Sequence, residues 1–141
     1  MKEATKISGK RLIGAVLLVT LLFTYIDALV HATVEALEIY SYPIPEFGRS
    51  ISESPLFWYA VGKFVSTLII SLLIIPFIRR WRFPAATKTL GYTLVIIALL
   101  EVRYFLSGAY DTTWHIYNVL MHFAVLFVSS FFVYKKLKIF S

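Results

Sequence analysis

Four apolar runs dominate this chain, and each is close to the length of a helix that crosses a lipid bilayer. They extend over Leu12–Val34, Leu56–Ile78, Leu90–Leu106 and Thr113–Tyr134. A helix of about 20 apolar residues spans the hydrocarbon core of a membrane, and it satisfies its own backbone hydrogen bonds there. The sequence therefore predicts an all-α integral membrane protein, a four-helix bundle that forms a single domain over residues 1–141.

The composition supports a membrane protein and excludes several chemistries. Hydrophobic residues make up 59% of the 141 residues and charged residues only 16%, more apolar surface than a soluble domain of this size can bury. The chain has no cysteine, which excludes disulfides, thiolate metal sites and thiol catalysis. The first run is long and lacks a small-residue cleavage site, so we expect a true membrane span.

The basic residues predict the orientation of the bundle. They gather in three blocks: Lys2, Lys6, Lys10 and Arg11; Arg79, Arg80, Arg82 and Lys88; Lys135, Lys136 and Lys138. Four spans place all three blocks on one side, and positive charge marks the cytoplasmic side of a membrane protein. We therefore expect both termini in the cytoplasm and the protein in the cell membrane. Blocks between apolar runs suit anionic lipid headgroups and argue against a nucleic-acid partner.

Polar side chains inside the runs gather in the half of the bundle that faces away from these blocks. They are Asp27, His31, Glu35, Lys63, Glu101, Arg103, His115 and His122, with Asn118 beside them. A rise of about 1.5 Å per residue places Asp27, Lys63, Glu101 and His122 at one depth, roughly 8–13 Å from the outer ends of their runs. Ionisable residues in a membrane are costly, so each is a candidate functional residue.

The spacing of these residues predicts that they face the interior. Residues that recur three or four positions apart lie on one face of a helix. Two such stripes occur: Asp27, His31 and Glu35 on the first run, and His115, Asn118 and His122 on the fourth. Facing lipid would be costly for either stripe.

One interpretation is a metal site that opens toward the outer face. Imidazole and carboxylate together suit Cu, Zn or Fe, and bundle cores commonly house such sites. The candidate ligands are Asp27, His31, His115 and His122. Glu101 would be a further ligand or a general base, and Lys63 would tune the local charge; these two are the candidate catalytic residues. Glu35, Arg103 and Asn118 complete the polar cluster.

A second interpretation is a structural network in a non-enzymatic subunit or assembly partner of a larger membrane complex. Asp27 would pair with Lys63, and Glu101 with Arg103 or Lys63. A small bundle held by polar contacts suits a homo-oligomer or other membrane subunits as partners. A lipid- or isoprenoid-binding protein and a proton or small-solute pathway are further alternatives. Ionisable residues are missing from the inner half of the spans, which argues against a proton or small-solute pathway. The sequence leaves open whether the chain is an enzyme.

The segment from Asp27 to His31 reads Asp-x3-His, and further short motifs occur at Ser54–Trp58, Lys63–Val65 and Leu90–Tyr92. These motifs resemble segments of the C subunit of the copper membrane monooxygenases, which oxidise methane or ammonia. The resemblance implies a compact helical bundle in which Asp27, His31, Glu101 and His115 belong together.

The chain departs from that family at other ligand positions. They fall near Phe57, Leu100 and Tyr104, which do not bind metal. Asn-x3-His occurs here as Asn118 to His122, on a different helix. The resemblance therefore groups candidate residues and does not assign monooxygenase activity.

Overall fold

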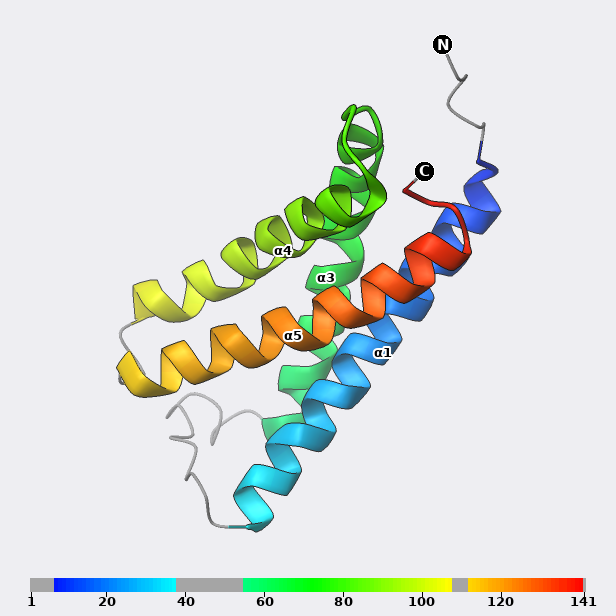
Figure 1. Ribbon diagram of the computed structural model, residues 1–141. Coiled ribbons are helices and arrows are strands. Elements are labelled where there is room, and N and C mark those ends of the chain that lie inside the picture. Colours follow the sequence, from blue (N-terminus) through cyan, green and yellow to red (C-terminus); the bar gives the residue numbers. More distant parts are fainter. Residues whose placement is uncertain (1–6, 38–54, 108–111, 141) are drawn as a thin grey trace.

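The computed structural model describes residues 7–37, 55–107 and 112–140, and in these ranges the regular structure is entirely helical (Figure 1). The helices are α1 (Gly9–Ala36), α3 (Pro55–Arg79), α4 (Ala85–Ser107) and α5 (Thr112–Lys136). All four are long and apolar enough to cross a membrane. The predicted all-α membrane bundle of four helices is confirmed.

The helices form a square arrangement in which each one packs against two others. α1 and α4 both pack against α3 and α5, so α1 lies diagonally opposite α4 and α3 lies diagonally opposite α5. Side chains on the inner faces of all four helices therefore reach a common centre. Contacts between diagonal partners cross that centre.

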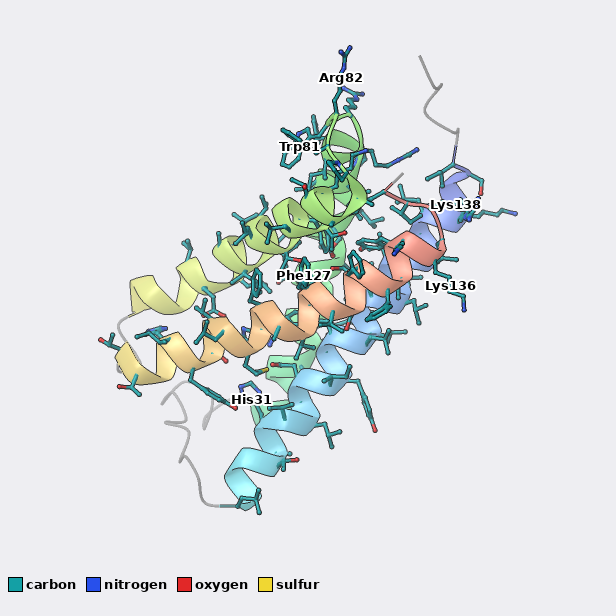
Figure 2. The ribbon with its side chains drawn as sticks, viewed as in Figure 1. His31, Trp81, Arg82, Phe127, Lys136 and Lys138 are labelled. Atoms are coloured by element: carbon teal, nitrogen blue, oxygen red, sulfur yellow. The ribbon has the colours of Figure 1, made fainter. Side chains whose placement is uncertain are left out.

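The start of α1, the turn between α3 and α4, and the end of α5 lie together at one end of the bundle (Figure 1). Arg82, Lys136 and Lys138 extend from this end, whereas His31 lies in the opposite half (Figure 2). We call it the basic end, after the basic residues of these three segments, and we call the opposite half of the bundle the cluster half. The start of α1 and the end of α5 share a side, as an even number of spans requires.

The turn at the basic end explains why α4 begins at Ala85 and not at Leu90, where the apolar run starts. The Lys88 amide donates to the Pro84 carbonyl at 3.1 Å, and the Lys88 side chain donates to the Arg79 carbonyl at 3.4 Å at the end of α3. The Trp81 ring lies against Gly91, where a Cβ would come within 2.5 Å of it. Polar residues of the first turn of α4 thus anchor the turn and do not break the helix.

The apolar core lies mainly toward the basic end. Its fully buried members include Val16, Val19, Ile75, Ile96 and Leu126. After α5 the chain turns back through Lys138, whose φ is 53°, and the Ile139 amide donates to the Tyr134 carbonyl at 2.8 Å. This left-handed turn closes the helix C-terminus and buries the Phe140 ring.

Candidate functional site

The centre of the cluster half holds a buried lysine that contacts two helices. Lys63 of α3 donates to the Asp27 carboxylate of α1, and its ammonium also contacts Nε2 of His122 on α5. Only 7% of Lys63, 2% of Asp27 and none of His122 is exposed. A lysine reaches this depth only when its charge is compensated. The predicted Asp27–Lys63 ion pair is confirmed.

His122 lies between two carboxylates. Its Nδ1 is 2.6 Å from Glu101 Oε1 on α4, and its Nε2 is 3.0 Å from Asp27 Oδ1. Asp27 Oδ1 has no hydrogen-bond partner among the described residues. His122 therefore joins α1 to α4 through one ring, across the centre of the bundle.

Asn118 holds Glu101 in place one turn before His122. The Asn118 amide donates to both Glu101 oxygens, at 3.1 Å and 3.4 Å. Asn118 is fully buried and Glu101 is 8% exposed. The carboxylate is thus fixed from two positions on the same face of α5. Glu101 pairs with an imidazole and an amide here, a combination that the sequence did not suggest.

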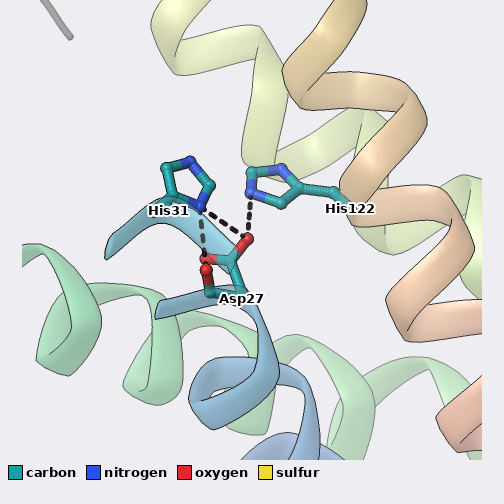
Figure 3. Close-up of side chains that lie close together, drawn as sticks. All are labelled: Asp27, His31 and His122. Atoms are coloured by element: carbon teal, nitrogen blue, oxygen red, sulfur yellow. Dashed lines mark hydrogen bonds and ion pairs between the residues drawn. The ribbon is translucent and has the colours of Figure 1, made fainter. Parts of the chain in front are cut away.

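His31 approaches the Asp27 carboxylate from one turn farther along α1 (Figure 3). Its Nδ1 is 2.9 Å from the Asp27 backbone carbonyl and 3.4 Å from Asp27 Oδ1. The rings of His31 and His122 stack at 6.0 Å with 27° between their planes. The helical spacing of four residues places the imidazole beside the carboxylate, as the stripe on the first run predicted.

Asp27, His31 and His122 form a group with the dimensions of a metal site. Each offers one ligand atom, and these atoms all lie within 4.8 Å of one another. All three side chains are buried. A ligand set of two imidazoles and one carboxylate suits Zn, Cu or Fe.

In their neutral form, both imidazoles carry the proton on Nδ1. A carbonyl or carboxylate oxygen accepts, so Nδ1 of His31 donates to the Asp27 carbonyl and Nδ1 of His122 donates to Glu101. The lone pair of each neutral ring is then on Nε2. In His122 this lone pair accepts from the Lys63 ammonium, whereas a second proton on Nε2 would face Asp27 Oδ1 at 3.0 Å. Metal-binding histidines are typically oriented in this way, by a carboxylate on the far nitrogen.

The charges of the cluster do not balance with neutral imidazoles. Asp27 and Glu101 contribute two negative charges, and Lys63 contributes one positive charge. Uncompensated buried charge is costly, so the described cluster favours one more positive charge. A proton on an imidazole or a bound cation would supply it.

The other predicted site residues fall outside this group. His115 is half-buried on α5, two turns before His122, and it is not a member of the metal-sized group found among the described residues. The side chains of Glu35 and Arg103 lie outside the described residues. Phe23 was not predicted: its ring contacts His122 edge-on at 5.7 Å, and the Lys63 ammonium lies 4.8 Å from its centre. The sequence signal for Phe23 was an aromatic residue one helical turn before Asp27.

Comparisons with protein-family models, with curated proteins and with solved structures returned no match. The resemblance to the monooxygenase subunit therefore stays a prediction. The chemistry of the cluster is that of two carboxylates, two imidazoles and one ammonium buried together.

Proposed function

We propose that this chain is a membrane protein that binds a divalent transition-metal ion in the cluster half. The observation that carries the proposal is the convergence of Asp27, His31 and His122, whose ligand atoms lie within 4.8 Å of one another inside the bundle. Three protein ligands leave a coordination position open, as in catalytic metal sites. Zn, Cu and Fe all accept such a ligand set.

The surroundings of His122 support this proposal. Glu101 accepts from its Nδ1 at 2.6 Å, and Asn118 fixes Glu101 in turn. Such outer partners orient a metal-binding histidine and raise its basicity. A divalent ion would also supply the positive charge that Asp27 and Glu101 lack.

Lys63 competes with the metal in this proposal. Its ammonium contacts the Asp27 carboxylate and the Nε2 lone pair of His122, both of which a metal ion would use. A metal ion and an ammonium repel each other, so metal binding requires Lys63 to move off these atoms. Lys63 would thus limit the affinity of the site. Roles of Lys63 and Glu101 in catalysis remain predictions.

The contacts of Lys63 also favour a second candidate, a structural network in a subunit of a larger assembly. An ammonium that compensates Asp27 and pairs with His122 holds three helices together without a metal ion. The candidate spans bury only 28–39% of their residues inside the bundle. The remaining surface faces lipid, a second copy of the chain or another subunit.

Metal analysis separates the two candidates. The protein would be purified in mild detergent without chelators, and its metal content measured by mass spectrometry. We expect near-stoichiometric metal in the wild type and its loss in His31→Ala and His122→Ala. Ser130→Ala, a buried polar change on α5 outside the cluster, serves as the control and retains the metal. His115→Ala also retains it if His115 is not a ligand.

The Lys63→Met variant distinguishes a metal site with which Lys63 competes from a purely structural network. If the site binds metal, removal of the ammonium raises the affinity for added Zn²⁺ or Cu²⁺. A wild-type protein without metal, together with a Lys63→Met variant that takes up neither ion, would leave the structural network as the explanation.

The proposed topology places the basic end in the cytoplasm and the cluster half toward the outside of the cell membrane. The chain has no native cysteine, so single cysteines at Lys10 or Lys136 can be labelled in intact cells without background. We expect protection from an impermeant maleimide at both positions. Labelling of either one before lysis would contradict this orientation.

A further inference from the structure

A second set of polar side chains continues inward from the cluster. On α3 the buried face reads Lys63, Thr67, Ser71 at intervals of four residues, and Thr67 and Ser71 are fully buried. Thr20 and Thr24 of α1 and Thr93 of α4 are buried or half-buried as well. We call this set the hydroxyl column: Thr20, Thr24, Thr67, Ser71, Tyr92, Thr93 and Tyr134.

Four threonines of the column have hydroxyls without a hydrogen-bond partner among the described residues. They are Thr20, Thr24, Thr67 and Thr93, and their hydroxyl oxygens are shielded from the outside of the bundle. A buried hydroxyl without a partner is unfavourable. Ordered water commonly satisfies buried polar groups that the protein itself does not.

Hydroxyls elsewhere in the same helices behave differently. Thr33, Thr89 and Ser130 each donate to the carbonyl four residues earlier, at 2.8, 2.9 and 2.6 Å. This local bond is the usual solution for a hydroxyl inside a helix. The threonines of the column do not use it, so their hydroxyls remain directed to partners other than the helix backbone.

The inner part of the column is already connected. Ser71 Oγ lies 2.7 Å from Tyr92 Oη, and Tyr134 Oη donates to Tyr92 Oη at 3.2 Å. All three residues are fully buried. Each of these oxygens can both donate and accept, so the three form a continuous hydrogen-bonded chain from α3 through α4 to α5.

The outer part of the column needs bridging water to become continuous. Four residues of helix, a rise of about 6 Å, separate successive members of the α3 stripe. Two hydrogen bonds of about 2.8 Å reach nearly as far, so one water bonded to both hydroxyls would connect Thr67 with Ser71. The α3 stripe begins at Lys63, a member of the cluster itself, so the proposed route follows α3.

We propose that the hydroxyl column holds bridging waters and carries protons between the cluster and the basic end. In each step an oxygen accepts a proton on one lone pair and releases another to the next oxygen. One proton moves inward, and each hydroxyl ends with the same number of bonds that it had. This function goes beyond metal binding and does not require a bound metal.

Phe140 covers the inner end of the column. Its ring lies 5.1 Å from the Tyr134 ring and 6.2 Å from the Tyr92 ring, both edge-on, and it is only 2% exposed. The turn at Lys138 holds it there. Exchange of protons with the aqueous side therefore has to pass this ring, which would make the conductance low.

Proton flux into liposomes tests the proposal. The wild type would be reconstituted with an internal pH dye, in EDTA, and a potassium gradient with valinomycin would drive protons inward. We expect flux above that of protein-free liposomes. Thr67→Val and Tyr92→Phe should each reduce it by about tenfold, the factor that corresponds to about 1.4 kcal/mol for one lost hydrogen bond.

Two further variants complete the test. Thr89→Val removes a hydroxyl that is bonded to its own helix, and we expect wild-type flux. Phe140→Ala uncovers the tyrosines and should raise the flux. Wild-type flux equal to that of protein-free liposomes overturns the proposal, and so does an equal loss in Thr67→Val and Thr89→Val. Because EDTA is present throughout, failure here leaves the metal proposal intact.

Discussion

The cluster half and the half toward the basic end are built on the same four helices, but they use opposite means to hold them together. In the cluster half, Lys63, Asp27, His122 and Glu101 meet at the centre through charged contacts. Toward the basic end the centre is filled by aliphatic and aromatic side chains and by hydroxyls.

This difference indicates where the chain accepts a cost for function. Well-packed apolar residues often replace a buried ion pair with no loss of stability, and the half toward the basic end shows that this bundle can be packed in that way. A structural role alone therefore does not require three helices to contribute charge at one depth. We propose that the charges are kept for a ligand that needs them.

The largest predicted effect is that of Lys63→Met in the presence of a chelator. It leaves the Asp27 carboxylate buried without its ammonium partner, and loss of one member of such a pair costs about 3–5 kcal/mol. The free energy of unfolding in detergent would be measured by denaturant titration. Added Zn²⁺ should restore part of the stability, because the metal ion replaces the lost charge.

The double variant Asp27→Asn/Lys63→Met is the control for that measurement. It removes both charges, so we expect a smaller loss than Lys63→Met alone, with a coupling energy between the two sites. If the two single losses simply add, the pair does not stabilise the cluster half.

A smaller effect is predicted for Glu101→Gln. The substitution preserves the shape of the side chain but removes the charge that orients His122. Loss of such an outer partner lowers metal affinity by about 10–100-fold. Calorimetric titration with Zn²⁺ measures this change. An unchanged affinity would mean that Glu101 does not orient a metal-binding ring.

In the half toward the basic end, Tyr134→Phe should cost about 1 kcal/mol, the net value of one hydrogen bond. The ring remains in contact with Tyr92 and Phe140, and only the hydroxyl bond to Tyr92 is lost. Thermal unfolding by circular dichroism is adequate for this difference. A loss of stability as large as that of Lys63→Met would contradict the predicted difference between the charged contacts of the cluster half and the contacts toward the basic end.

The smallest effect is expected for Thr67→Val, which removes a buried hydroxyl without a partner among the described side chains. Stability should change by less than about 1 kcal/mol, because a hydroxyl bonded to water contributes little more to folding than the methyl group that replaces it. The same unfolding assay gives the answer. A clear loss of stability would show that the Thr67 hydroxyl has a structural partner.

Much of the fold could be predicted from the sequence, because run length and helical rise are local properties. The depth of Asp27, Lys63, Glu101 and His122 followed from counting residues, and their contacts confirm it. The Asp27–Lys63 pair was predicted, but the partners of Glu101 were not, since they depend on the rotation of each helix about its axis. Glu101 accordingly meets His122 rather than Lys63 among its hydrogen-bond partners.

The hydroxyl column shows a second limit. Threonine is neutral in an apolar run, so Thr20 and Thr24 went unnoticed, although they extend the stripe of Asp27 and His31 at helical spacing. Whether a threonine bonds its own helix or faces a neighbour depends on its rotamer. The left-handed turn at Lys138, which buries Phe140, also has no sequence signal such as a glycine.

The most direct test of the metal site is electron paramagnetic resonance of the protein loaded with one equivalent of Cu²⁺. Cu²⁺ binds nitrogen and oxygen ligands more tightly than the other divalent ions of its row, so it reports on the site whichever metal is native. We expect hyperfine coupling to imidazole nitrogen from both His31 and His122, with one coupling lost in each alanine variant and none lost in Ser130→Ala. A spectrum without imidazole coupling, or one that neither histidine variant changes, would contradict the proposed metal site.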